Sequence, residues 1–161
     1  MSPPATPSPA AAPGRWSVEA RARSSAPPGQ VWPLLGEAGR WKEWSFLTGT
    51  GLERTGDPPP DGVGAVRRFT RFGIGSREEV VAWDPPHHLG YIMLTGFPVR
   101  NYRADVILAP DGSGTAVTWS ATFDEKIPAT GHLMRVVLVR MVSGFASGLA
   151  AYADRLLDGG G

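Results

Sequence analysis

The sequence predicts an α+β fold: a curved, seven-stranded antiparallel sheet wrapped on one long C-terminal helix, with two short helices after the first strand. Two patterns carry this prediction. Short segments of alternating apolar and polar residues follow one another from about residue 67 to residue 123, and an apolar-faced helical segment follows over 128–157. One helix covers a curved sheet only partly, so we expect a pocket between the two and look for the function there.

The composition fits one soluble globular domain. Apolar residues make up 42% and charged residues 19% of the 161 residues. The formal net charge is only +1, which gives no electrostatic argument for a nucleic-acid partner. The absence of cysteine excludes disulfides, thiolate metal ligands and Cys nucleophiles, and it fits a cytoplasmic location.

The two ends of the chain differ from the region between them. Residues 1–14 are rich in Pro and Ala and lack the basic start and apolar core of a signal peptide, so we expect a disordered tail. Residues 15–158 form the single predicted domain, and 159–161 a flexible glycine end. The most apolar stretch, 133–153, contains Arg135 and Arg140, which argues against stable membrane insertion.

The first part of the domain alternates between strand and helix. Residues 16–23 alternate apolar and polar side chains, which is typical of a half-buried strand. Pro27 and Pro28 then favour a helix entry. The predicted elements are strand 16–23, helices 30–35 and 40–44, strand 48–54 and a proline-containing polar loop at 55–62.

Five further strands are predicted, separated by turn signals at Gly73 to Gly75, Asp84 to His87, Gly96 to Pro98 and Pro110 to Gly114. They span 65–72, 76–83, 89–95, 100–108 and 115–123.

Side-chain alternation predicts which faces are buried. In the last two strands the inward residues are Tyr102, Ala104, Val106 and Leu108, followed by Val117, Trp119, Ala121 and Phe123. On the closing helix the predicted inward stripe is Leu133, Val137, Met141, Gly144, Gly148 and Tyr152. Glycine inside a helix costs about 1 kcal/mol relative to alanine, so Gly144 and Gly148 require a packing or cavity explanation.

Several short motifs occur in a characteristic order between residues 16 and 157. They are APPGQVW at 26–32, WKEW at 41–44, GVGAVR at 62–67 and EEVVAWDPP at 78–86, with Leu89, Tyr91, Gly114, Thr115 and Trp119. In this order they resemble the helix-grip fold of the START and Bet v 1-like (SRPBCC) superfamily, and within it the bacterial polyketide cyclase/dehydrase group. The resemblance implies a deep cavity for an apolar or amphipathic small molecule, but it does not imply one particular reaction.

Three residues are candidates for catalysis. Arg67 shares a strand face with Phe69, so an inward guanidinium would bind a ligand carboxylate or steady an enolate; the alternative is a cross-strand pair with Glu78 or Glu79. Glu79 is a candidate general base, or else a solvated or paired surface carboxylate. Tyr102 would donate a hydrogen bond to a ligand carbonyl, and its plainer role is core packing.

A second group of residues are candidates for ligand contact. Aromatic rings and methionines suit a flat or adaptable apolar ligand, although core packing explains several of them equally well. The predicted ligand-binding residues are Trp44, Phe69, Tyr91, Met93, Trp119, Phe123, His132 and Met141. His132 falls in the first turn of the closing helix, either as a proton shuttle at the cavity mouth or as an exposed helix-start histidine.

We expect neither a metal nor a cofactor. His87 and His88 are adjacent, so on a strand they would point to opposite faces, which is poor geometry for a shared metal ion. The sequence contains no phosphate loop and no dinucleotide fingerprint.

Three functions remain open at this point. The first is a protein, monomeric or homodimeric, that binds a small hydrophobic or amphipathic ligand without turnover. The second is a polyketide cyclase, aromatase or dehydratase that holds its substrate in the cavity. The third is a protein-interaction module, which a filled interior and an exposed apolar patch would favour.

Overall fold

The computed structural model describes residues 12–160. The predictions for residues 1–11 and Gly161 lie outside this range. In chain order the elements are β1 (Trp16–Ser24), α1 (Pro28–Gly36), the 3₁₀ turn η1 (Ala38–Arg40), α2 (Trp41–Trp44), β2 (Gly49–Arg54), β3 (Val66–Arg71), β4 (Ile74–Asp84), β5 (His88–Thr95), β6 (Val99–Asp111), β7 (Gly114–Glu125) and α3 (Gly131–Gly159).

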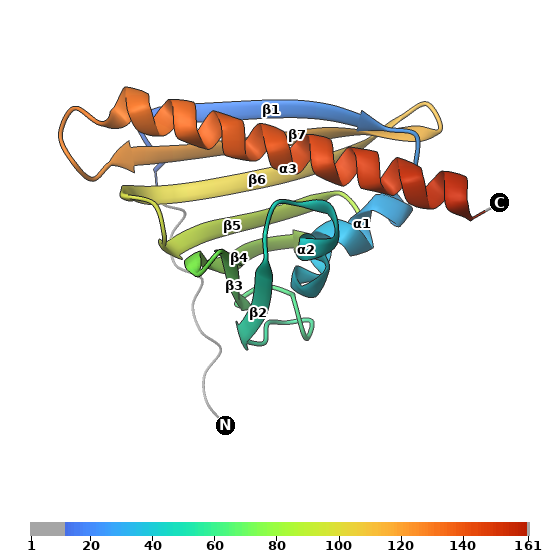
Figure 1. Cartoon of the computed structure of the whole chain (residues 1–161). Helices are drawn as coiled ribbons and strands as arrows, with labels where there is room; N and C mark the ends of the chain where they lie inside the picture. Colours follow the sequence, from blue (N-terminus) through green and yellow to red (C-terminus); the bar gives the residue numbers. More distant parts are fainter. Residues whose placement is uncertain (1–11, 161) are drawn as a thin grey trace.

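Within residues 12–160 the seven strands form one antiparallel sheet in the order β1-β7-β6-β5-β4-β3-β2 (Figure 1). The predicted α+β fold is confirmed, with every element within a few residues of its expected bounds. One turn differs. The β3–β4 hairpin turns at Phe72 and Gly73, both with positive φ, so Ile74 and Gly75 belong to β4 rather than to the turn.

The long helix covers one side of the sheet only. It lies along β1 and β7, and α1 and α2 lie on the same face of the sheet, beside the C-terminal half of α3 (Figure 1). Asp154 near the end of α3 accepts hydrogen bonds from the Ser24 hydroxyl (2.8 Å) and the Ser25 backbone N–H (2.7 Å). These bonds fix the C-terminal half of α3 to the β1–α1 connection and leave the inner faces of β3 to β5 uncovered near its first half.

The predicted faces of β6 and β7 are confirmed, because all eight inward residues are buried. The stripe on α3 is shifted. Leu133 is 60% exposed, and the residues that pack on the sheet are Met134, Leu138, Val142, Phe145, Leu149 and Ala153. Both stripes are apolar, so periodicity alone did not separate them. The predicted stripe instead contributes Val137, Met141 and Gly144 to the edge of a cleft.

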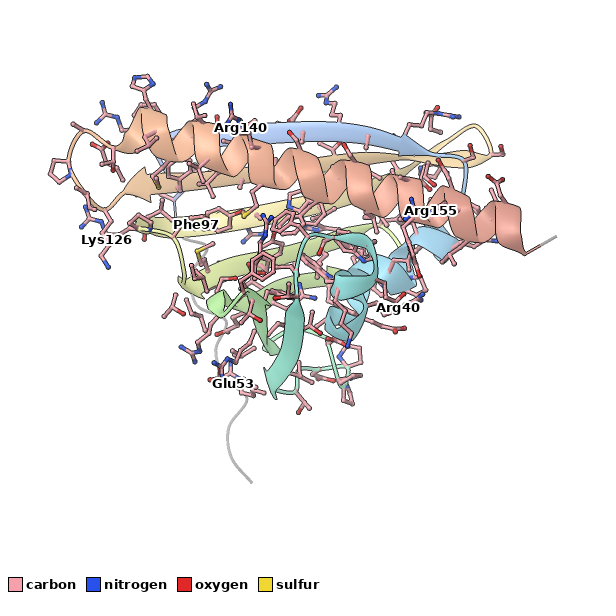
Figure 2. The ribbon with its side chains drawn as sticks, in the orientation of Figure 1. Arg40, Glu53, Phe97, Lys126, Arg140 and Arg155 are labelled. Carbon is pink, nitrogen blue, oxygen red and sulfur yellow. The ribbon has the colours of Figure 1, made fainter. Side chains whose placement is uncertain are left out.

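An aromatic cluster fills the interior beneath α1 and α2. Trp41 stacks on Phe69 at 4.6 Å between ring centroids, and Trp119 stacks on Phe145 at 5.3 Å. The Trp41 indole N–H donates to the carbonyl of Leu35 (2.8 Å), so this ring buries no orphan donor. The space between sheet and helix, where a cavity was expected, is therefore filled at the α1–α2 end, and a cleft is present at the other end. Charged side chains such as Arg140 and Lys126 lie at the periphery (Figure 2).

Candidate functional site

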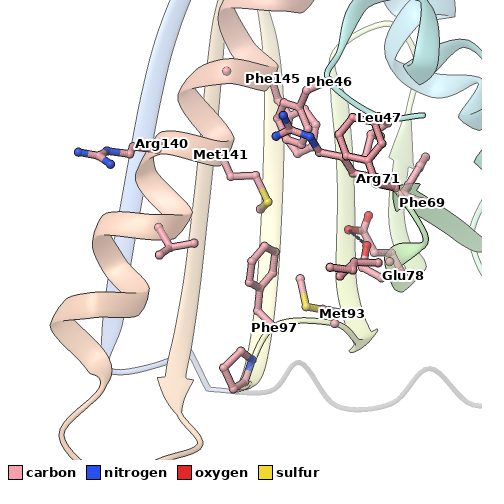
Figure 3. Close-up of a pocket in the computed structure, with 18 of the residues that line it drawn as sticks. Phe46, Leu47, Phe69, Arg71, Glu78, Met93, Phe97, Arg140, Met141 and Phe145 are labelled. Atoms are coloured by element: carbon pink, nitrogen blue, oxygen red, sulfur yellow. Dashed lines mark hydrogen bonds between the residues drawn. The ribbon is translucent and has the colours of Figure 1, made fainter. Parts of the chain in front are cut away.

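A cleft of about 860 Å³ opens between the first half of α3 and the inner faces of β3, β4 and β5 (Figure 3). The loop at 96–98 and the β3–β4 hairpin form its outer edge. Its walls are mostly apolar, and its lining includes Phe69, Met93, Phe97, Met141 and Phe145. A volume of this size matches small-molecule sites in proteins.

Glu78 places a carboxyl group in the wall of this apolar cleft. Its side chain is 6% exposed, and its Oε2 atom has no hydrogen-bond partner among the described residues. The Ser76 hydroxyl donates a long hydrogen bond to Oε1 (3.4 Å). Burial raises the pKa of the Glu78 carboxyl from 4.5 to about 7, while the Arg67 guanidinium opposes part of that rise. A carboxyl group whose pKa lies close to physiological pH can both give and accept a proton.

Arg67 lies beside Glu78 in the β3–β4 register and is completely buried. One nitrogen, Nη1, donates to the carbonyl of Gly36 (3.3 Å), and within the described residues Nε and Nη2 have no partner. The guanidinium carbon sits 5.1 Å from the Trp41 ring centroid and 5.4 Å from that of Phe69, so the two rings supply cation–π contacts. Burial lowers the pKa of Arg67, and the Glu78 carboxyl counteracts this. Arg67 does not line the cleft. Its effect there is electrostatic, because its positive charge lowers the pKa of the Glu78 carboxyl.

Two tyrosines complete this polar group. The Trp119 indole N–H donates to the Tyr91 hydroxyl (3.1 Å), and in the described part of the chain the buried Tyr102 hydroxyl has no partner. Burial raises the pKa of both phenols, so both are neutral donors at physiological pH. Arg67, Glu78, Tyr91 and Tyr102 together form what we call the polar core.

Glu79, the predicted general base, lies on the opposite face of β4. Its carboxylate pairs with Arg54 (3.2 Å), and its side chain is 31% exposed. The structure therefore separates Glu79 from the cleft and puts Glu78 there. The alternation of β4 contains the signal for this assignment, because Glu78 shares the face of Val80, which is fully buried.

The predicted ligand-contact residues fall into three groups. Phe69, Met93 and Met141 line the cleft. Trp44, Tyr91, Trp119 and Phe123 are buried in the core and do not line it, since the aromatic cluster fills that space. His132 is exposed at the start of α3, edge-on to Trp16 at 4.6 Å, and lies outside the cleft. Phe46, Phe97 and Phe145 line the cleft and were not among the predicted contacts.

Metal ions and membranes are the other partners to consider for the described residues. Residues 12–160 contain no group of three or more His, Cys, Asp or Glu side chains placed to hold a metal ion. The same region contains one helix, α3, whose length and composition would allow it to cross a membrane. This is weak evidence for a span, because the core helix of a soluble protein passes the same test and α3 packs on the sheet.

The comparison with known families agrees with this architecture. The model of the family described as polyketide cyclase/dehydrase and lipid transport matches residues 15–156. The chain belongs to this family. A search of curated proteins finds no significant match.

Solved structures of similar fold extend the comparison. A solution structure from Thermobifida fusca is 29% identical, with a TM-score of 0.70 over 86% of this chain and 91% of that one. A START superfamily protein from Mycobacterium smegmatis is 12% identical, with a TM-score of 0.74 over 87% and 98% of the two chains. Ara h 8.0201 is 15% identical, with a TM-score of 0.66 over 86% and 97%. The fold of this polyketide cyclase/dehydrase and lipid transport family member is thus the helix-grip fold of START and Bet v 1-like proteins, and family and fold together support hydrophobic ligand binding in general.

Proposed function

We propose that the cleft binds an amphipathic small molecule of the polyketide, lipid or aromatic type, with its apolar body against Phe69, Met93 and Met141 and a neutral hydrogen-bonding group at Glu78. The observation that carries this proposal is an open, mostly apolar cleft of about 860 Å³, whose wall holds a buried carboxyl oxygen with no hydrogen-bond partner within residues 12–160. A buried polar atom of this kind is normally satisfied, and a ligand hydroxyl or carbonyl would satisfy it.

The apolar walls support a ligand of adaptable shape. Met93 and Met141 face each other across the cleft with Phe97 between them (Figure 3). Methionine side chains adjust to irregular apolar surfaces, and aromatic rings favour flat groups. A carboxylate at the buried end is disfavoured, because Glu78 would then face a like charge.

Native mass spectrometry of the purified protein, followed by identification of any co-purified molecule, is the direct test. Anilinonaphthalene sulfonate, an aromatic amphiphile, serves as a probe when the protein is empty, and fatty acids and polycyclic phenols then serve as competitors. Met141→Trp should fill the cleft, so that the probe and its competitors no longer bind there. Ser147→Trp, on an exposed position of the same helix, should leave the competition between them unchanged. Equal behaviour of the two variants would contradict binding in the cleft.

The polar core favours a second candidate function, proton transfer within a bound polyketide-like substrate, as in a cyclase, aromatase or dehydratase. Glu78, the one member of the polar core that lines the cleft, would take a proton from a carbon next to a carbonyl of the bound substrate. Glu78→Gln should then abolish turnover while ligand binding remains, and Glu79→Gln should keep full activity. Conversion of a ligand by Glu78→Gln at the wild-type rate would eliminate this mechanism.

We further propose that the protein works in the cytoplasm, as a monomer or homodimer, and without nucleic acid. The cysteine-free chain fits a reducing compartment, and a net charge of +1 gives no attraction to nucleic acid. Gel filtration with light scattering tests the oligomeric state.

A further inference from the structure

The entrance of the cleft carries large apolar side chains that point into solvent. Phe72 is 79% and Ile74 is 82% exposed at the tip of the β3–β4 hairpin. Phe46 (36%) and Val136 (48%) lie on the other sides of the same opening, and all four residues line the cleft. We call these four residues, together with Arg71 and Arg140, the rim. Isolated exposed apolar residues are common in soluble proteins, but a contiguous group around one opening indicates an interaction surface.

The backbone at Phe72 makes this exposure more informative. Phe72 has φ 51° and Gly73 has φ 83°, so the pair forms a two-residue hairpin turn that requires positive φ at both positions. Asn, Asp or Gly suits the first position, whereas a bulky side chain there is strained. The turn thus holds an aromatic ring in water at a position that a small polar residue would occupy with less strain. Strain and exposure at one residue together point to a role outside the folded core.

The charges of the rim are of one sign. Arg71 reaches over the Phe46 ring, 5.3 Å from its centroid, and Arg140 stands on the outer side of α3 (Figure 3). Neither guanidinium forms an ion pair or a side-chain hydrogen bond with any residue the structure describes. Among the described residues that line the cleft the one acid is Glu78, which is buried. The exposed part of the rim is therefore apolar and cationic.

We propose that the rim docks on the surface of an anionic lipid bilayer, with Phe72 and Ile74 inserted among the headgroups and Arg71 and Arg140 paired with lipid phosphates. Apolar tips flanked by arginines are the side-chain combination that binds such surfaces. Docking in this position would set the opening of the cleft against the lipid, so that an apolar ligand passes between bilayer and cleft without crossing water. This extends the proposed ligand binding to a partner surface, and it does not depend on which ligand the cleft holds.

A second copy of the chain fits the rim less well. A twofold interface places the same patch on both partners, so two rims meeting face to face would bring four guanidiniums together. An anionic bilayer supplies the opposite charge.

Co-sedimentation of the full chain with vesicles tests the proposal. Vesicles of phosphatidylcholine and phosphatidylserine in equal parts should bind the protein, binding should weaken as salt is added, and pure phosphatidylcholine should bind it less. The double variant Phe72→Asn/Ile74→Thr should bind about tenfold more weakly, from the loss of two inserted apolar side chains. Arg71→Gln should bind about fivefold more weakly, with a smaller salt dependence.

The variants contain their own folding control. Asparagine suits the positive φ of position 72, so the double variant should be at least as resistant to urea as wild type, and weaker vesicle binding would then not reflect unfolding. Leu156→Thr is the matched control, since Leu156 is 47% exposed at the other end of α3, and its binding should equal wild type. Probe binding in the cleft is measured without vesicles for each variant, so that any change in ligand binding is separated from the change in vesicle binding. Leu156→Thr, which lies outside the cleft, should leave both unchanged.

Three results would overturn the proposal. One is equal binding to anionic and neutral vesicles, or to neither. Another is undiminished binding of Phe72→Asn/Ile74→Thr. The third is a concentration-dependent dimer that the same double variant abolishes while vesicles fail to bind, which would assign the rim to self-association.

Discussion

Replacing Glu78 by glutamine should change how the stability of the protein depends on pH. The buried carboxyl has a pKa of about 7 in the folded protein, against 4.5 in its ordinary state. Below about pH 4.5 the group is protonated in both the folded and the unfolded chain and makes no difference. As the pH rises towards 7, the unfolded chain releases the proton first and is favoured, so the wild type loses stability.

The size of this loss follows from the two pKa values. A difference of about 2.5 units, at about 1.4 kcal/mol per unit, corresponds to about 3 kcal/mol. Glu78→Gln cannot titrate, so relative to wild type it should gain about 3 kcal/mol between about pH 4.5 and about pH 7.5. Removing the carboxyl group beside Arg67 changes the stability of the variant by a similar amount at every pH in this range. It does not create a pH dependence, because Arg67 and the two tyrosines stay in one protonation state over the range.

Urea denaturation of wild type and variant, followed by circular dichroism at several pH values, measures the gain. Glu79→Gln is the matched control, since that side chain is next in sequence but lies on the outer face beside Arg54. A free-energy difference between wild type and Glu78→Gln that stays constant with pH would refute the reasoning. It would mean that the Glu78 carboxylate is ionised when folded, through a direct pair with Arg67 or through water in the cleft.

Three further predictions concern packing and the polar core. Gly148→Ala should destabilise the protein by about 1–3 kcal/mol, because the added Cβ would overlap the Trp44 carbonyl, whereas Gly144→Ala, with Phe46 3.6 Å away, should stabilise it by up to about 1 kcal/mol in urea denaturation. Arg67→Met should be neutral or stabilising at about pH 5, where Glu78 is protonated, since the buried cation makes one hydrogen bond within residues 12–160, and a loss above about 2 kcal/mol at that pH would contradict this. Asp154→Ala should lower stability by about 1–3 kcal/mol through its two lost hydrogen bonds, measured as a fall in Tm; an unchanged Tm would show that they do not hold α3.

The sequence predicted the architecture because alternation and turn residues are local signals. The faces of β6 and β7 followed directly from a period of two, and both strands are buried as expected. The phase of α3 did not follow, since Leu133 and Val136 make its outer side apolar as well. No local pattern separates a helix face that packs on a sheet from one that borders an open cleft.

Only part of the site could be predicted from sequence patterns. Glu79 was named as the candidate base without assigning it to a face of its strand, although alternation with the buried Val80 places Glu78 on the inner face. The turn predicted at 73–75 lies instead at Phe72 and Gly73, and Phe at positive φ is not a recognised turn signal. The filling of the cavity by Trp41 and Trp119 arises from contacts between elements far apart in the chain. The roles of Arg67 and Tyr102 in binding or catalysis stay predictions.

Phe69 and Phe145 belong to the aromatic cluster and to the wall of the cleft at once. A mutation at either would change ligand preference and stability together, so the inner half of the cleft cannot be altered without a cost in folding stability. Met93, Phe97 and Met141 are only partly buried, so substitutions there carry a smaller penalty. Evolution can therefore retune specificity from the outer half of the cleft inwards, and relatives that share this fold while diverging in ligand should differ first at these outer positions.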